Sequence, residues 1–425
     1  MLDIMLIREK TDFVKQGCAN KKNTVDIDAI IALDAKRREI IGEVEVLKSK
    51  RNKASEEIAL LKKEKKDAAG LIADMKQVSD TIKQYDDQLK IVDEEIHTKM
   101  SWVPNLPHVG VPHGKSEADN VVAATWGENR VFDFEPKDHL TLGTALDIMD
   151  FARGAKISGS GFPVYKGKGA LLERAIINFM LDTHTTKNSY CEIFPPFLVN
   201  RESLFGTGGL PKSLDQMYHM EEDDLFCVPT AEVPVTNMHR NEILTMAELP
   251  IRYCAYTACF RREAGAWGKD TRGFLRLHQF NKVELVKFAT PETSYAELET
   301  LRADAEGILR ALKLPYRVLS LCDADISFAA AKCYDLELWA PGEKRFLEVS
   351  SVSNFEDFQA RRMNIRYRAA PHDKPQFVHT LNGSGVATAR LLVAILETYQ
   401  TKEGNITVPE VLRPYMHGME EIRGE

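Results

Sequence analysis

Residues 260–288 read FRREAGAWGKDTRGFLRLHQFNKVELVKF, and this segment says more about the fold than any other in the chain. Residues 252–260 are rich in Tyr, Thr, Cys and Phe, and residues 275–288 are rich in Leu, Val and Phe, so each segment predicts a strand. The polar segment 264–273 between them contains Gly265, Gly268 and Gly273, which predicts a loop. We therefore expect a strand, a loop and a return strand.

Charged and aromatic side chains could gather on one face of these strands. Successive side chains of a strand point to opposite faces, so Arg261 and Glu263 share a face. On the return strand, Arg276, Phe280 and Glu284 share a face as well. If the strands pair, these residues can converge on a charged ligand, because charges are rarely buried without a partner. Spacing alone favours a solvated face with scattered salt bridges over a ligand site, so the choice between the two depends on the rest of the chain.

Composition indicates a globular protein of about two or three domains. The 425 residues are 44% hydrophobic and 28% charged, and the seven cysteines include no CxxC pair. Scattered cysteines argue against a zinc site or a disulfide framework and favour a reducing cytoplasm. We expect no secretory signal and no membrane span, since the start carries both charge signs and no run of about 18 apolar residues occurs. With a net charge of −7, any nucleic-acid partner needs a local basic patch.

A heptad pattern covers residues 28–100. Two series with alternating gaps of three and four run from Ile30 to Leu61 and from Leu71 to Ile96, without a proline, and their positions are hydrophobic except for Arg37 and Arg51. This spacing is typical of an antiparallel coiled-coil hairpin, here with a polar connection at residues 62–70. The proline- and glycine-rich residues 100–114 mark a boundary, so we expect an N-terminal domain at 1–110 and a second domain at 111–425.

The hairpin is basic although the chain is acidic. Residues 48–66 contain eight Lys or Arg and three Glu, a balance of +5. A solvated coiled-coil face and a contact with a phosphate backbone both fit this pattern. The candidate nucleic-acid-binding residues are Lys48, Arg51, Lys62, Lys63, Lys65 and Lys66.

The second domain reads as α+β on an antiparallel sheet, because helices and strands do not alternate regularly. The expected helices are 143–157, 170–188, 293–312 and 386–398, and further strands are expected at 191–199, 225–228, 334–339 and 346–351, with a turn at Gly383–Gly385. The chain has no Walker loop, no complete dinucleotide fingerprint and no legible Ser/His/Asp arrangement. Any nucleotide chemistry must therefore use side chains on the sheet.

Several residues suit such chemistry. Arginines bind phosphates through two donors and a permanent charge, and Phe280 could stack on a base. Glu348 next to Ser351 could bind Mg²⁺ through oxygen. Arg390 falls in the first turns of an expected helix, where an anion is favoured. Taken singly, each of these is more often a salt bridge or a helix cap than a ligand.

Three segments resemble the signature motifs of class II aminoacyl-tRNA synthetases. The helix 170–188 with Pro195-Pro196 resembles motif 1, Phe260-Arg-Arg-Glu with its hairpin resembles motif 2, and Gly383–Arg390 resembles motif 3. Together with the N-terminal hairpin, the sequence resembles the seryl-tRNA synthetases of the bacterial type. The phrases Pro229-Thr-Ala-Glu and Glu348-Val-Ser-Ser agree with this resemblance, which covers essentially the whole chain.

The resemblance implies a ligase that forms seryl-adenylate from serine and ATP and then charges tRNA-Ser, and often tRNA-Sec. It implies a cytoplasmic homodimer joined through motif 1, Mg²⁺ as a cofactor, and a hairpin that grips the long variable arm of tRNA-Ser. The loop 264–273 would reorganise to meet the tRNA 3′ end. Two departures from the family pattern are Ala389, where Gly is usual, and Gly161, where Arg is usual.

The resemblance also implies site residues. Arg261 and Arg390 would be catalytic, and Glu348 and Ser351 would bind the metal. The implied ATP-binding residues are Arg261, Arg262, Glu263, Arg276, Leu277, Phe280, Glu348, Val349, Ser350, Ser351 and Arg390. The implied serine-binding residues are Thr230, Ala231, Glu232, Arg261, Glu284 and Ser384.

Two alternative functions are weighed against this one. A synthetase-like paralogue that loads an amino acid onto a carrier protein is disfavoured, because such paralogues lack the basic hairpin. A coiled-coil interaction protein with an inactive catalytic domain is disfavoured by the intact set of charged residues, which includes Arg261, Glu284 and Arg390.

Overall fold

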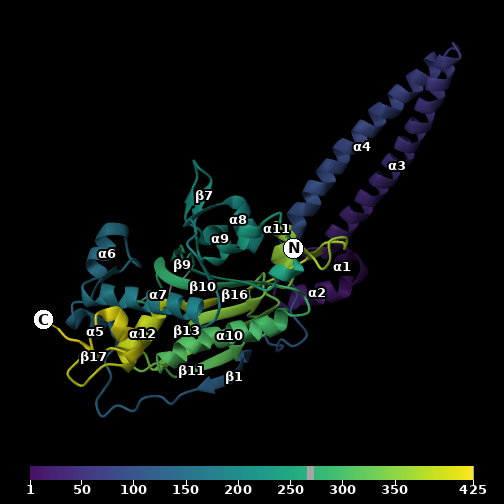
Figure 1. Cartoon of the computed structure of the whole chain (residues 1–425). Coiled ribbons are helices and arrows are strands. Elements are labelled where there is room, and N and C mark those ends of the chain that lie inside the picture. Colours follow the sequence, from purple (N-terminus) through teal and green to yellow (C-terminus); the bar gives the residue numbers. More distant parts are fainter. Residues whose placement is uncertain (266–271, 425) are drawn as a thin grey trace. The chain divides into compact units, whose positions relative to one another are not determined.

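The computed structural model describes residues 1–265 and 272–424, and the chain divides into two compact units, Met1–Pro104 and Asn105–Glu425. The boundary lies within residues 100–114, the stretch that the sequence marks as a break. Figure 1 shows the helices of the first unit and the central sheet of the second.

The first unit is entirely helical in its regular structure. Its helices are α1 (Ile4–Glu9), α2 (Thr11–Asn20), α3 (Ile27–Lys63) and α4 (Ala69–Ser101). Helices α3 and α4 lie side by side as a hairpin (Figure 1). All the expected heptad positions are buried or half-buried, which confirms the predicted hairpin. The connection is shorter than expected, since α4 already includes Gly70.

A buried carboxylate joins the first helices of this unit. Asp34 of α3 accepts from Arg8 Nε at 2.8 Å and from a terminal guanidinium nitrogen of Arg8 at 3.0 Å. Arg38 Nε donates to the same carboxylate at 3.1 Å. Two guanidinium groups thus compensate one buried charge and hold α1 against α3.

The second unit is built on an eight-stranded sheet in the order β1-β11-β12-β13-β16-β10-β9-β4. All neighbours are antiparallel except β4 and β9, so the predicted α+β class with an antiparallel sheet is confirmed. The strands are β1 (Val121–Trp126), β4 (Cys191–Ile193), β9 (Ile251–Phe260), β10 (Gln279–Ala289), β11 (Tyr316–Ser320), β12 (Lys332–Ala340), β13 (Arg345–Asn354) and β16 (His379–Ala387).

Three helices pack into the main core with this sheet: α7 (Lys168–Thr186), α10 (Ser294–Ala311) and α12 (Thr388–Thr398). The other helices are α5 (His139–Ala145), α6 (Phe151–Ser158), α8 (Arg201–Thr207), α9 (Glu232–Thr236) and α11 (Phe358–Met363). Short 3-10 turns occur at Glu117–Asp119, Leu214–Gln216, Asn237–His239, Met246–Glu248 and Glu410–Met416.

Four small sheets complete the second unit. They pair β2 (Met149–Asp150) with β3 (Val164–Tyr165), and β17 (Ile406–Thr407) with β18 (Glu421–Ile422). The two others are three-stranded: β5 (Leu198–Asn200), β7 (Leu225–Cys227) and β6 (His219–Met220), then β15 (Gln376–Phe377), β14 (Arg366–Arg368) and β8 (Ile243–Thr245).

Three predicted elements are wrong in detail. The helix expected at 143–157 is split into α5, β2 and α6, with Asp147 at φ +52° between them. The strand expected at 191–199 is two strands in different sheets, because Pro195 and Pro196 lie between β4 and β5 and offer no backbone N–H.

The turn expected at Gly383–Gly385 is also absent, since β16 runs straight through it. The glycines serve close packing: a Cβ at Gly383 would lie 2.3 Å from Leu301, and one at Gly385 would lie 2.7 Å from His184 Nε2. Among the described residues, no helix is long and apolar enough to cross a membrane.

Replacing Asp34 with Ala should lower the stability of α1 and α3 by about 1–3 kcal/mol, because a buried charged hydrogen-bond acceptor is lost. Asp93 provides a control, since it pairs with Arg37 at 2.6 Å but its side chain is 46% exposed. Asp93→Ala should lower stability by less than about 1 kcal/mol. Hydrogen exchange along α3 of the full-length chain measures both, and equal loss of protection would contradict the role given to Asp34.

Candidate active site

A pocket of about 620 Å³ lies over the middle strands of the large sheet. Most of the site residues expected from the sequence line it. These are Thr230, Glu232, Arg261, Arg276, Leu277, Phe280, Glu284, Glu348, Val349, Ser350, Ser351, Ser384 and Arg390. The structure therefore brings together residues from β10, β13, β16, α9 and α12 and from the segments next to β9 and β10.

Strand β10 supplies one side of the pocket. Phe280, Lys282 and Glu284 line it at every second position, while Val283 and Leu285, on the opposite face, belong to the main core. This alternation is the period of two that a strand imposes. Lys282 was not predicted, although it shares the face of Phe280 and Glu284, and its Nζ lies 2.5 Å from Glu284 Oε2.

Two carboxylates occupy the same part of the pocket. Glu284 is buried and accepts from Asn382 Nδ2 at 3.1 Å, while Glu232 accepts from Gln359 Nε2 at 2.6 Å. Burial, and after it the negative charge of Glu284, raises the pKa of Glu232 to about 7. A positively charged ligand group bound here would relieve this repulsion.

The end of β9 places a guanidinium beside an aromatic ring. The Arg261 N–H donates to the His278 carbonyl at 2.9 Å, and His278 Nδ1 donates to the Arg261 carbonyl at 3.0 Å. The Arg261 guanidinium lies 5.1 Å from the centre of the Phe280 ring. An anion can therefore bind at Arg261 while a planar base lies near Phe280.

The prediction that the charged residues around residues 260–288 share strand faces is only partly correct. Strand β9 ends at Phe260 and β10 begins at Gln279, so Arg261, Glu263 and Arg276 lie outside the strands. Glu263 adopts φ +50°, which costs about 1–2 kcal/mol for a residue with a side chain. Its carboxylate forms an ion pair with Arg276 Nε, and this contact holds the strained turn.

The first turn of α12 places Arg390 at the pocket. Arg390 Nε donates to the Leu275 carbonyl at 3.0 Å, and a terminal nitrogen donates to the Glu348 carbonyl at 2.9 Å. The Arg390 side chain is thus fixed by two backbone oxygens, one from the return segment before β10 and one from β13.

The oxygen donors on β13 fit a divalent cation. Ser351 pairs across the ladder with Asp335 of β12, and its Oγ lies 3.1 Å from Cys333 Sγ. Burial, and after it the charge of Glu348, raises the pKa of Asp335 well above its ordinary value. Carboxylate and hydroxyl oxygens are the ligands that Mg²⁺ prefers, and a cation would offset the repulsion between the carboxylates of Asp335 and Glu348.

Three predicted site residues do not line the pocket. Arg262 is exposed, and its N–H donates to the Gln216 carbonyl at 2.9 Å. Ala231 is buried in a separate apolar cluster, and Glu263 is paired with Arg276. In the loop 264–273, predicted to meet the tRNA, residues 266–271 lie outside the described residues.

The basic residues of the hairpin lie in the first unit. Lys62, Lys63, Lys65 and Lys66 are exposed around the connection between α3 and α4. Lys48 lies 3.8 Å from Asp86, and Lys66 lies 2.8 Å from Glu64, so each has an acidic neighbour. Arg51 is half-buried at a heptad position.

Sequence reasoning missed a second group of pocket residues. Lys282 could have been found from the strand period, and Asn382 lies two residues before Ser384 on β16. The others lie partly on loops and partly on α8, β13, β16 and α12, and the sequence alone did not single them out as site residues. They are Thr207, Gly208, Gly209, Lys212, Ser213, Phe274, Leu275, Ser327, Phe328, Ala329, Ser353, Phe355, Ala387 and Ala389.

The two departures from the family pattern have different surroundings. Ala389 lines the pocket and is buried. Gly161 has φ +80°, and a Cβ there would lie 2.4 Å from His278 Cδ2. A larger residue at position 161 would therefore require His278 to move.

The comparisons with known proteins agree with this geometry. Residues 216–399 match the tRNA synthetase class II core domain (G, H, P, S and T), and residues 1–107 match the seryl-tRNA synthetase N-terminal domain. A serine–tRNA ligase from Chloroherpeton thalassium is 57% identical over 98% of this chain and 99% of its own length.

Two solved structures share the fold over the whole chain. The seryl-tRNA synthetase from Pyrococcus horikoshii complexed with ATP has a TM-score of 0.94 at 37% identity, with all of both chains covered. The cytoplasmic serine–tRNA ligase from Naegleria fowleri in complex with AMP has a TM-score of 0.88 at 28% identity, covering 100% of this chain and 99% of the other.

Replacing Glu232 with Gln should remove a dependence of stability on pH. With its pKa raised from 4.5 to about 7, folded Glu232 keeps a proton that the unfolded chain has lost, so its contribution to the free energy of unfolding falls as pH rises through that window. The stability gain of Glu232→Gln over the parent should therefore grow across that window. Thermal unfolding from about pH 5 to about pH 8 measures it, and a pH-independent difference in Tm would contradict the pKa.

Proposed function

We propose a mechanism for this chain that starts from its family: it belongs to the seryl-tRNA synthetases, within the class II synthetases. It is a serine–tRNA ligase, which activates serine with ATP and attaches the serine to tRNA. The similarity spans both units and so disfavours the two alternatives, a carrier-protein paralogue without the hairpin and an inactive interaction protein. From the geometry, the convergence of Arg261, Glu284 and Arg390 in one pocket supports this activity most strongly.

We assign the nucleotide to the side of the pocket that contains the arginines. The adenine ring would stack on Phe280 beside the Leu277 backbone, with Arg390 over its other face. Arg276 would hold the outer phosphates, and Glu263 would contact the adenine side once Arg276 turns from it to the nucleotide. The guanidinium groups support this assignment, because they offer paired donors and a charge that does not titrate.

Glu348 and Ser351 would hold Mg²⁺, with Val349 and Ser350 shaping the same strand segment near the nucleotide. When bound, Mg²⁺ neutralises phosphate charge and orients the leaving pyrophosphate. Ser350 Oγ donates to the Ser384 carbonyl at 2.6 Å, so this segment is tied to β16. That bond would fix the position of the nucleotide part of the site relative to the amino-acid part.

Serine would bind at the carboxylates. Its ammonium group would sit near Glu232 and Thr230, and its hydroxyl would bond Glu284, with Ser384 at the same pocket. Contacts with Asn382 and Lys282 hold the Glu284 carboxylate in one orientation, so it could accept a hydrogen bond from the serine hydroxyl without first being ordered. Ala231 would contribute through its backbone, since its side chain is buried elsewhere.

The reaction needs positioning and charge more than a protein base. A serine carboxylate oxygen attacks the α-phosphorus, a P–O bond to pyrophosphate breaks, and seryl-adenylate remains. Arg261 would stabilise the negative charge that develops on the α-phosphate. In the second step a ribose hydroxyl of the tRNA 3′ end attacks the serine carbonyl, and AMP leaves with the bonding electrons.

We propose that two copies of this chain pair through the motif 1 region. Phe194 is 76% exposed beside a groove of about 490 Å³ that is lined in part by α7 and Tyr256. Among the described residues, Glu173 Oε2 and Tyr165 Oη are buried there without a hydrogen-bond partner. An exposed aromatic next to unsatisfied polar atoms supports an interface.

We further propose that the hairpin grips the long variable arm of tRNA-Ser, with tRNA-Sec as a second acceptor of the same shape. The exposed lysines around its connection support contact with a phosphate backbone. All seven cysteines are free thiols, which supports a reducing compartment such as the cytoplasm.

Serine-dependent ATP–pyrophosphate exchange tests the first step. Serine should support exchange, and alanine should be rejected by about 10⁴-fold because the Glu284 acceptor is then left unpaired. Arg261→Ala should lower exchange by about 10²- to 10³-fold while tRNA binding persists. Normal exchange in Arg261→Ala, or equal exchange with serine and alanine, would contradict these roles.

Changing Lys62, Lys63, Lys65 and Lys66 to Glu should raise the KM for tRNA at least about tenfold and leave pyrophosphate exchange unchanged, because the two units have separate tasks. The matched control makes the same charge change at four other exposed lysines of the hairpin, namely Lys36, Lys83, Lys90 and Lys99. Aminoacylation and exchange are measured on both. If the control loses tRNA charging equally, the effect is general charge repulsion and not a contact at the connection.

A further inference from the structure

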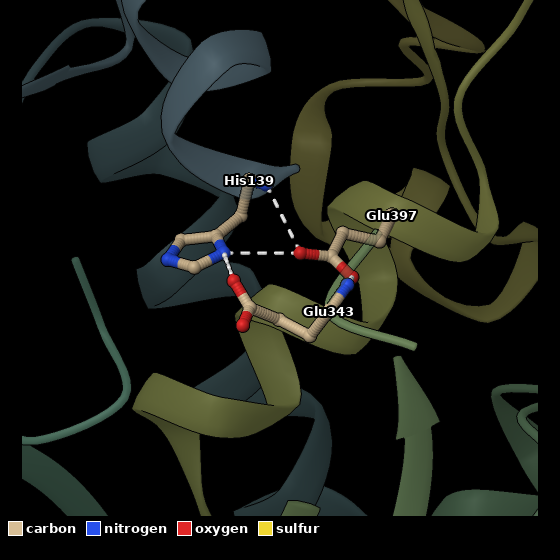
Figure 2. A group of neighbouring side chains, drawn as sticks. All are labelled: His139, Glu343 and Glu397. Atoms are coloured by element: carbon tan, nitrogen blue, oxygen red, sulfur yellow. Dashed lines mark hydrogen bonds and ion pairs between the residues drawn. The ribbon is translucent and has the colours of Figure 1, made fainter. Parts of the chain in front are cut away.

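A buried group of three ionisable side chains lies outside the pocket. Figure 2 shows His139 of α5, Glu343 in the turn between β12 and β13, and Glu397 of α12 pointing toward one another. His139 and Glu397 are fully buried, and the Glu343 side chain is 5% exposed. None of them lines the pocket.

The acceptors of Glu397 are already occupied by the protein. The His139 backbone N–H and ring Nδ1 both lie 3.0 Å from Glu397 Oε1 (Figure 2). The backbone N–H groups of Gly342 and Glu343 donate to Oε2 at 2.9 and 3.1 Å. With four donors on two oxygens, this carboxylate serves as a fixed anchor and leaves little room for a metal ion.

The other ring nitrogen of His139 contacts the return segment of motif 2. The Phe274 backbone N–H donates to His139 Nε2 at 3.3 Å, so Nε2 carries the lone pair and Nδ1 carries the proton that faces the carboxylates. Gly273, at φ +61°, permits this approach, because a Cβ there would lie 2.2 Å from Nε2.

Helix α12 therefore holds the same segment at two points. Arg390 bonds the Leu275 carbonyl directly, and Glu397 holds Phe274 through His139. Arg390 and Glu397 are seven residues apart on one helix, which places them on the same face about two turns apart. Phe274 and Leu275 both line the pocket and lead into Arg276.

We propose that His139 is a positioning residue for nucleotide binding: anchored by Glu397, it fixes the Phe274 amide and so places the segment that orients Arg390 and Arg276. This rests on the nucleotide role proposed above for those arginines. His139 touches no substrate. Its loss should weaken ATP binding and leave serine binding unchanged, since the serine side of the pocket is held by other contacts.

Two amide substitutions of His139 distinguish the contact made by Nε2 from the contact made by Nδ1. Gln places its oxygen near the position of Nε2 and can still accept from the Phe274 amide, whereas Asn places its amide near Nδ1 and keeps only the bond to Glu397. In pyrophosphate exchange, His139→Asn should raise the KM for ATP about tenfold, the equivalent of one buried hydrogen bond, with the KM for serine unchanged. His139→Gln should keep the KM for ATP within about twofold of the parent.

A second histidine controls for stability. His379 Nδ1 bonds Ser294 Oγ at 2.8 Å, and His379 does not line the pocket, so His379→Ala, which removes this bond, should lower Tm without changing either KM. If His139 had a purely structural role, both of its variants would lower Tm and the fraction of active enzyme, and the KM for ATP would not change. That result, or equal KM values for ATP in His139→Asn and His139→Gln, would overturn the proposal.

Arg390→Ala separates this inference from the proposed function. If Arg390→Ala raises the KM for ATP and His139→Asn does not, the positioning role fails and the nucleotide assignment stands. If Arg390→Ala leaves the KM for ATP unchanged, the assignment of Arg390 fails and the positioning role fails with it.

Discussion

Strand β10 has to satisfy two environments at once, and the rest of the catalytic unit depends on how it does so. The odd-numbered Val283, Leu285 and Ala289 enter the core shared with α7, α10 and α12. The even-numbered Phe280, Lys282 and Glu284 enter a polar pocket. A shift of one residue in register would place charges in the core, so core packing and the placement of site residues are a single constraint.

The parts of the fold that could be predicted from sequence are those whose pattern is local. The heptads of the hairpin set both helices, because an apolar stripe at a period near 3.5 is satisfied by the adjacent helix alone. The strands expected at 334–339 and 346–351 are β12 and β13, which are neighbours in sequence and pair with each other, so they are local in the same sense. The lengths of α7 and α10 also agree with the expected ranges within about two residues, which is the usual scatter of helix ends.

The details that could not be predicted depend on distant contacts. Residues 275–278 look like strand, but β10 begins at Gln279, because the preceding segment is held by His139 and Arg390 instead of a neighbouring strand. The glycines of β16 look like a turn and are needed for packing against Leu301 and His184. Part of the pocket lining comes from Thr207–Ser213 and Ser327–Ala329, whose place depends on the whole tertiary structure.

Glu232 and Glu284, the two carboxylates of the proposed serine site, affect which amino acids the pocket would accept. Burial, and after it the negative charge of Glu284, raises the pKa of Glu232 to about 7, so a cation bound beside Glu232 would stabilise its ionised form. A free α-amino group supplies that cation, whereas an N-formylated or N-acetylated serine does not. A serine bound as proposed would therefore be selected by charge for its free amino group, in addition to the contacts of its side chain.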